Sequence, residues 1–191
     1  MHKTLSIDAA TGLLIGARQV LSPHFDERPP QVEPALIVVH GISLPPGEFG
    51  GPWIDRLFCG NLAGGSPAGS GPVSFADIAS LRVSAHAVIR RGGDITQYVP
   101  FDARAWHAGE SSYQGRAACN DFSVGIELEG TDETPYTEPQ YRSLSRLILA
   151  LCEAYPTLGI GHVTGHSDIA PGRKSDPGPA FDWARLRALL A

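Results

Sequence analysis

Residues 161–178, GHVTGHSDIAPGRKSDPG, concentrate two histidines, two aspartates, an arginine and a lysine in a segment that glycine and proline interrupt repeatedly. Glycine and proline break regular helices and strands, so we expect no helix in this segment. We therefore expect the ionisable groups from His166 to Asp176 to lie on a loop, where rigid scaffolds often carry functional side chains. The rest of the chain must supply that scaffold.

Hydrophobic patterning predicts several strands. ALIVVH at 35–40 is a short apolar run rich in branched residues, which is typical of a buried strand that ends at His40. VSAHAVIR and DITQYVP flank the turn RRGGD and predict a β-hairpin. SVGIELEG at 123–130 predicts a further strand.

The clearest helix is predicted to begin at Thr137 and to end at Tyr155, before a proline. Thr137 and Gln140 have the spacing of a capping box, and apolar residues then recur every three or four positions. FDWARLRALL predicts a last short helix, with Asp182 as its N-cap.

The remaining segments complete the predicted architecture. A short helix is expected at 53–58, and one or two helical turns at 74–81, whereas the small and polar stretch at 59–72 is expected to be a surface loop. Strands, one long helix, short helices and long loops together predict a mixed α/β domain. A length of 191 residues suits a single domain over 1–191, with 1–21 as an N-terminal extension packed on or near it.

Composition narrows the class of function. The formal net charge is −5 with no run of like charges, which disfavours binding of nucleic acid. The three cysteines are far apart and form no C-x-x-C pair, so we expect free thiols, as in the cytosol. No apolar stretch approaches the roughly 20 residues of a membrane span, and the first residues do not resemble a signal peptide. We therefore expect a cytoplasmic protein that binds no membrane.

Three residues are candidate metal ligands. A catalytic zinc takes three ligands from histidine, aspartate or glutamate and leaves one position open for water. His40 at the end of a buried strand, His166, and Asp176 ten residues later form such a set. Asp168 is an alternative to Asp176, and the chain has no H-E-x-x-H motif that would decide the matter locally.

Two further residues are candidates for acid–base and electrostatic roles. Glu127 is a carboxylate in the apolar strand VGIEL, and a buried carboxylate is costly unless it has a partner or a role. Glu129 shares its strand face and can take the same role, and either can instead pair with an arginine. Lys174, two residues before Asp176, is close enough to stabilise an oxyanion.

Other polar residues rank lower. His86 lies in the middle of a predicted strand and is expected in the core or behind a site, and His107, beside Trp106, is a candidate for a pocket wall. No serine lies in a G-x-S-x-G motif, and Cys119 has no local signature of a nucleophile, which disfavours covalent catalysis.

Long blocks of the sequence resemble a known family. VVHGISLPPGEFGGPWIDRLF, LRVSAHAVIRRGGDITQYVPFDARAWHAGESSYQGRAACNDFSVGIELEGTD and TGHSDIAPGRKSDPGPAFDW are similar to the cytosolic 1,6-anhydro-N-acetylmuramyl-L-alanine amidases of Gram-negative bacteria. The resemblance extends from about Ser22 to the C-terminus. These enzymes belong to a broader group of zinc amidases, whose fold is shared with peptidoglycan recognition proteins and with bacteriophage amidase lysozymes.

The resemblance implies a fold, a reaction and a set of roles. The fold would be a central mixed β-sheet flanked by helices. His40, His166 and Asp176 would bind zinc, Glu127 would be the catalytic carboxylate, and Lys174 would stabilise the oxyanion. The substrate would be a cytosolic muropeptide from cell-wall turnover, cut between anhydro-N-acetylmuramic acid and L-alanine.

The resemblance also implies substrate contacts. Arg82 matches a family position that holds the stem peptide, whose carboxylates come from D-glutamate and meso-diaminopimelate. Arg116 and Arg173 are further candidates for those carboxylates, and Trp106 is a candidate for packing against sugar or peptide.

Two positions depart from the family pattern. Gly41 stands where asparagine is common after the first ligand, and Ala118 stands where arginine is common before Cys-Asn-Asp. Both concern substrate contacts, and Arg116 can compensate for the second. A binding module that does not cleave, and an exported wall lysin, are the alternatives. The first would lack a metal ligand, and the second would need an export signal or a wall-binding module.

Overall fold

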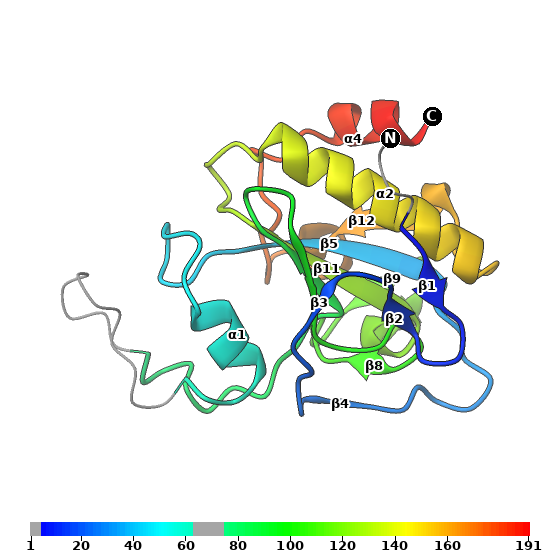
Figure 1. Ribbon diagram of the computed structural model, residues 1–191, viewed down its shortest axis with the longest axis horizontal. Coiled ribbons are helices and arrows are strands. Elements are labelled where there is room, and N and C mark those ends of the chain that lie inside the picture. Colours follow the sequence, from blue (N-terminus) through cyan, green and yellow to red (C-terminus); the bar gives the residue numbers. More distant parts are fainter. Residues whose placement is uncertain (1–4, 63–74) are drawn as a thin grey trace.

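The computed structural model describes residues 5–62 and 75–191, which are built around one six-stranded mixed sheet (Figure 1). Its strands lie in the order β12 (Val163–Gly165), β5 (Leu36–Ile42), β11 (Ser123–Glu129), β6 (Ala87–Ile89), β7 (Ile95–Gln97) and β3 (Arg18–Gln19). The four strands from β12 to β6 are parallel, β7 is antiparallel to β6, and β3 is parallel to β7. A mixed sheet flanked by helices is the expected fold class.

Shorter elements surround the sheet. Three antiparallel pairs are formed by β1 (Ile7–Asp8) with β2 (Leu13–Leu14), β4 (Phe25–Asp26) with β8 (Arg104–Ala105), and β9 (Ser112–Tyr113) with β10 (Arg116–Ala117). The helices are α1 (Trp53–Phe58), α2 (Glu138–Ala154), α3 (His166–Ile169) and α4 (Trp183–Leu190), with 3-10 turns η1 (Cys119–Asp121) and η2 (Ile160–His162).

Helix α2 covers one face of the sheet, and its boundaries are those predicted. Thr137 and Gln140 form the expected capping box, in which each side chain accepts a hydrogen bond from the other's backbone amide. The apolar stripe of α2 packs on alternate residues of β5 and β11, including Ile37, Val39 and Ile126. Helix α4, capped by Asp182 as predicted, contacts the outer side of α2 (Figure 1).

The other face of β5 and β11 is also covered, which explains why ALIVVH is apolar without alternation. Leu36 and Val38 point away from α2 and pack against Ala108, Phe122 and Ile169. His40 has the same parity as these two residues, so it lies on this second face.

The register of the two central strands brings polar residues together. In the parallel pair, Glu127 on β11 lies opposite His40 on β5, and Gly165 on β12 lies opposite Val39. The carboxyl ends of parallel strands therefore meet at one edge of the sheet, which is where open α/β sheets bind ligands.

Several predicted boundaries were wrong. The first strand continues two residues past His40, to Ile42, and the strand predicted over 83–90 is reduced to Ala87–Ile89. Residues 75–81 form hydrogen-bonded turns in place of a helix. The surface loop predicted at 59–72 lies largely outside the described residues.

The segment 161–178 was also predicted wrongly in part. It contains the end of η2, strand β12 and the one-turn helix α3, so His166–Ile169 are helical where a loop was expected. The physical reason is long-range pairing, because three residues of this segment join the sheet beside β5.

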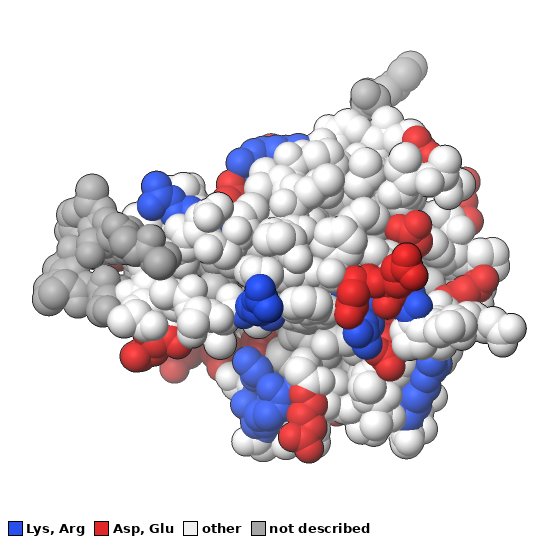
Figure 2. All heavy atoms as spheres, turned by 90° about the horizontal axis from the view of Figure 1, so that it is seen from below, with Lys and Arg blue, Asp and Glu red and all other residues white. Residues whose placement is uncertain are grey.

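The surface and the thiols agree with the composition. On the face shown in Figure 2, acidic and basic side chains of the described residues lie in small mixed groups between large uncharged areas. The three cysteines form no disulfide. Within the described residues, no helix combines the length and the apolar character that crossing a membrane requires.

Candidate active site

His40, His166 and Asp176 converge at the carboxyl edge of the sheet. The Nδ1 atoms of the two histidines lie 3.0 Å apart, and each lies 3.1 Å from Asp176 Oδ2. One potential ligand atom from each residue lies within 4.8 Å of the other two, so the group is able to hold a metal ion.

Each member of this cluster is held by a different element. His40 is in the interior of β5, and His166 is the first residue of α3, directly after β12. Asp176 lies on the following loop, which is fixed where its carbonyl accepts a hydrogen bond from Ser167 N at 2.9 Å. Asp168 is not in the cluster, because its carboxylate accepts from Gly165 N at 2.9 Å and so caps α3.

Burial sets the protonation of the cluster. It lowers the pKa of His40 to about 4, even though Asp176 acts to raise it, so the imidazole is neutral at pH 7. Burial alone would raise the pKa of Asp176, but its contacts with the His166 and His40 rings outweigh burial and lower that pKa below its ordinary value. Neutral imidazole and ionised carboxylate are the forms that bind metals.

Glu127 lies beside this cluster without a partner. Among the buried side-chain oxygen and nitrogen atoms of the described residues, Glu127 Oε2 alone has no hydrogen bond. Burial raises the pKa of Glu127 well above its ordinary value, Asp176 raises it further, and Lys174 acts to lower it. A carboxylate with a buried, unpaired oxygen beside the His40, His166 and Asp176 cluster fits a site that receives a cation.

A pocket of about 250 Å³ opens onto these groups. Its wall contains all five residues expected to carry the chemistry, together with Trp106 and a set of apolar side chains. The apolar part is made by Ile42, Leu57, Phe58, Leu81 and Val83. Trp106 is fixed by its indole N–H, which donates to Asp26 Oδ1 at 3.1 Å.

The three arginines proposed for substrate carboxylates lie outside the described lining of this pocket. Arg82 is exposed, between the lining residues Leu81 and Val83. The Arg116 guanidinium lies over the ring of Phe122, 3.9 Å from its centroid. Arg173 donates to the carbonyl oxygens of neighbouring loop residues, Ala108 and Glu110. Their role in binding stays a prediction.

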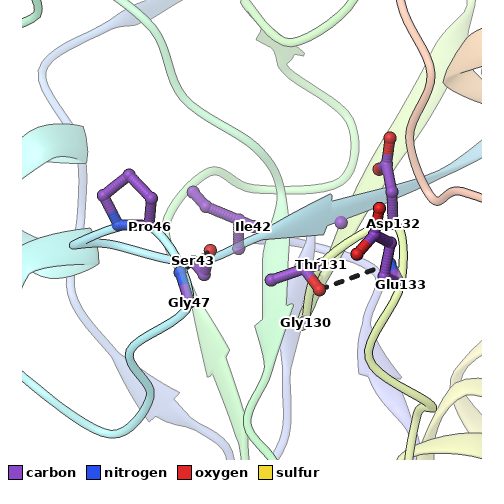
Figure 3. A pocket seen from close by; sticks show the side chains of 9 residues that line it. Ile42, Ser43, Pro46, Gly47, Gly130, Thr131, Asp132 and Glu133 are labelled. Atoms are coloured by element: carbon purple, nitrogen blue, oxygen red, sulfur yellow. Dashed lines mark hydrogen bonds between the residues drawn. The ribbon is translucent and has the colours of Figure 1, made fainter.

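Gly41 and Ile42 line both this pocket and a second one. Figure 3 shows the second pocket, with Ile42 and Ser43 on one side and Asp132 and Glu133 on the other. Its volume is about 600 Å³, and Asp132 and Glu133 contribute carboxylates to its wall. Gly41 faces a crowded position, because a Cβ atom there would lie 2.3 Å from the hydroxyl oxygen of Tyr136. A larger residue at 41 therefore requires Tyr136 to move.

Sequence reasoning missed what lies behind the two histidines. His40 Nε2 contacts His107 Nδ1 at 2.9 Å, and His166 Nε2 contacts the carbonyl oxygen of Ala108 at 3.1 Å. Asn120 Oδ1 in turn accepts from the backbone amides of both His107 and Ala108. The AWHAG stretch was recognised as a pocket wall, but a backbone carbonyl and a distant asparagine leave no local signal in a sequence.

Comparison with known proteins gives one consistent result. Residues 31–179 match the model of the N-acetylmuramoyl-L-alanine amidase family. The chain is 61% identical over 180 residues to an Escherichia coli protein named 1,6-anhydro-N-acetylmuramyl-L-alanine amidase AmpD, covering 94% of this chain and 95% of that one.

Solved structures agree. A crystal structure of a selenomethionine derivative of AmpD superposes with a TM-score of 0.88 at 59% identity, covering 97% of this chain and 99% of that one. AmpDh3 from Pseudomonas aeruginosa, solved in complex with anhydromuramic pentapeptide, superposes with a TM-score of 0.58 at 27% identity, covering 82% of this chain and 59% of that one. Family match, overall identity and fold lead to one conclusion: the chain belongs to the N-acetylmuramoyl-L-alanine amidase family.

Proposed function

We propose that this chain hydrolyses the amide bond between anhydro-N-acetylmuramic acid and L-alanine in muropeptides, with zinc held by His40, His166 and Asp176. The observation that carries the proposal is the convergence of these three ligands in a pocket that Glu127 and Lys174 also line. The Escherichia coli relative carries the name of this activity, and the AmpDh3 structure contains an anhydromuramic pentapeptide.

The donor set suits zinc. Two imidazole nitrogens and one carboxylate oxygen are typical of a catalytic zinc site with one open position. When bound, zinc would supply Lewis-acid polarisation of the scissile carbonyl and lower the pKa of a coordinated water. Beside that positive charge the Glu127 carboxyl would ionise more readily, although burial raises its pKa.

Glu127 and Lys174 would carry the remaining chemistry. The Glu127 carboxylate accepts a proton from the attacking water and passes it to the departing amine of L-alanine. The Lys174 ammonium stabilises the oxyanion that develops on the scissile carbonyl. Trp106 and the apolar wall exclude water from the rest of the pocket and orient the substrate.

The substrate would be an intracellular product of wall turnover, and we place the enzyme in the cytoplasm. Stem peptides of muropeptides carry carboxylates, which the exposed side chain of Arg82 beside the pocket can attract despite the net acidic chain. Arg116 and Arg173 are weaker candidates, because the structure already engages both guanidinium groups.

The proposal is tested with anhydro-N-acetylmuramyl-tripeptide and mass spectrometry. We expect free tripeptide and anhydro sugar, loss of both products when a chelator removes zinc, and recovery when zinc is returned. His166→Ala should abolish zinc binding and turnover. His162→Ala, at an exposed histidine in the same segment, is the matched control and should leave both unchanged.

Two outcomes would overturn the proposal. Full turnover by a His166→Ala protein would remove the metal site from the mechanism. A zinc-loaded wild-type chain that binds but does not cleave the tripeptide substrate would make the chain a recognition module of this fold.

A further inference from the structure

Two consecutive residues, His107 and Ala108, contact the two histidines of the cluster on the side away from Asp176. Each histidine presents Nδ1 to the cluster and directs Nε2 away from it. The partner of one Nε2 is the His107 ring, and the partner of the other is the Ala108 carbonyl. The nature of these two partners determines where the protons are.

The tautomer of His166 follows from a single contact. A carbonyl oxygen can only accept a hydrogen bond, so the 3.1 Å contact with Ala108 requires a proton on His166 Nε2. In a neutral ring, that proton leaves the lone pair on Nδ1, which faces the cluster.

The tautomer of His40 follows from a chain of three contacts that ends at another carbonyl. Ser123 Oγ lies 2.6 Å from the carbonyl oxygen of Cys119, so its hydroxyl proton points there. The Ser123 oxygen is then free to accept from His107 Nε2 at 3.1 Å. His107 therefore keeps its lone pair on Nδ1, accepts from His40 Nε2–H at 2.9 Å, and leaves His40 Nδ1 as a bare donor to the cluster.

The His107 ring is fixed on two sides. A Cβ atom at Gly125 on β11 would lie 2.4 Å from His107 Cγ, so the ring lies directly against the strand backbone. On the other side, Asn120 Oδ1 holds the backbone amides of His107 and Ala108 at 3.1 and 2.8 Å. The half-buried ring also contacts the His40 ring edge to face, with 5.0 Å between the ring centroids.

We propose that His107 is a positioning residue that acts through His40. It accepts a hydrogen bond from His40 Nε2–H, which leaves the His40 Nδ1 lone pair to bind the metal, and it is itself fixed by its hydrogen bond to Ser123. This role rests on the metal site of the proposed function and adds a residue that acts through a metal ligand. Groups that orient metal-bound histidines in this way typically change metal affinity by about 10- to 100-fold when they are removed.

The test measures zinc affinity by competition with a chromophoric chelator. His107→Leu removes the acceptor, and we expect the zinc Kd to rise by about 10- to 100-fold. His107→Asn places an amide oxygen near the position of Nδ1, and we expect it to restore most of the affinity. A purely structural role would not distinguish leucine from asparagine in this direction, because asparagine fills the apolar space less well.

The matched control is His86→Leu. His86 is a buried histidine that contacts the His107 ring, but its hydrogen bonds run to Gly125 N, the Ala103 carbonyl and Arg28. The same substitution therefore damages the same region without touching the ligand chain. Far-UV circular dichroism of every variant establishes that it is folded before its zinc affinity is compared.

A second readout does not depend on variants. In zinc-loaded wild-type protein labelled with ¹⁵N-histidine, two-bond ¹H–¹⁵N correlations should show His107 as the neutral Nε2–H tautomer, and His40 and His166 with protons on Nε2. An Nδ1–H tautomer at His107 would overturn the proposal.

The zinc affinities of wild type and variants test the positioning role of His107 separately from the proposed function. A wild-type chain that binds no zinc would overturn both. If wild type binds zinc and His107→Leu binds it equally well, the positioning role of His107 is overturned and the metal site stays. The same holds if His86→Leu weakens zinc binding as much as His107→Leu does.

Discussion

Glu127 and Glu129 lie two residues apart on the same face of β11, yet their surroundings differ completely. Glu129 pairs with Arg90 at 3.0 Å and accepts from the backbone amides of Gly50 and Arg91. Glu127 has a buried oxygen with no partner and a raised pKa. The Glu129 carboxylate links neighbouring elements of the fold, whereas Glu127 keeps an oxygen without a hydrogen bond beside the candidate metal ligands.

A position on one strand face does not by itself determine the role of the residue there. Arg90 reaches Glu129 from the strand edge and also pairs with Asp55 at 3.2 Å, so it links the sheet to α1. Glu127 lies opposite His40, where the neighbouring groups are imidazoles, a carboxylate and Lys174. Because Glu129 is engaged by a guanidinium and two backbone amides while Glu127 Oε2 has no hydrogen bond, Glu127 is the candidate for proton transfer.

The largest expected effect is the loss of turnover in Glu127→Gln, which tests the difference between positions 127 and 129. We expect turnover of anhydro-N-acetylmuramyl-tripeptide to fall by about 10²- to 10⁴-fold, since an amide cannot accept the proton of water. Zinc affinity and fold should be retained, because Gln has nearly the same shape. Steady-state kinetics and zinc content measure this, and wild-type turnover in the variant would exclude Glu127 as the base.

Glu129→Ala should have the opposite profile. Removing one member of a buried ion pair leaves an uncompensated charge, and we expect a loss of about 3 kcal/mol in the free energy of unfolding, the lower end of the usual range because Arg90 keeps Asp55. Urea denaturation measures it, with Glu127→Ala as the matched control, for which we expect no comparable loss. Equal destabilisation by the two variants would contradict the distinction drawn above.

The free energy of unfolding of the metal-free protein should depend on pH because the pKa of Glu127 is raised. We expect this effect to be smaller than that of Glu129→Ala. Its folded pKa is raised above the ordinary value of 4.5, so its contribution to stability is complete below pH 4.5 and is lost as the pH rises through the folded pKa. Relative to Glu127→Gln, the metal-free wild type should therefore lose stability as the pH increases above 4.5, by at most about 1.4 kcal/mol per pH unit.

Urea denaturation of both proteins without metal, from pH 5 to pH 8, measures this difference. Zinc should reduce it, because a bound cation favours the ionised carboxyl. Parallel stability curves for the two metal-free proteins would show that the carboxyl of Glu127 is not perturbed in solution.

Local patterns predicted much of the scaffold. The capping box at Thr137 and the apolar stripe of α2 both depend on residues three or four positions apart, and α4 likewise begins at its predicted cap. The strand β11 was found at nearly its observed length, because its apolar residues Val124, Ile126 and Leu128 alternate with small or polar ones.

Features created by distant pairing could not be predicted in this way. Strand β12 lies in a glycine-rich segment and exists because it pairs with β5. The residues alone left Glu127 and Glu129 interchangeable, because the partners of Glu129 come from other parts of the chain. The choice between Asp176 and Asp168 was equally open, although a carboxylate three residues after Gly165 is a local sign of a helix cap.

The pairing of His40 with Glu127 also constrains how chains of this kind can change length. Both residues lie inside seven-residue strands in parallel register. A single inserted or deleted residue before either of them would turn its side chain toward α2, where an imidazole or carboxylate would meet the apolar core. Insertions are therefore tolerable in the long connection between the two strands and in the turns beyond them, but not within β5 or β11. The register of β5 and β11 thus fixes the spacing of His40 and Glu127, while the surrounding loops can vary in length.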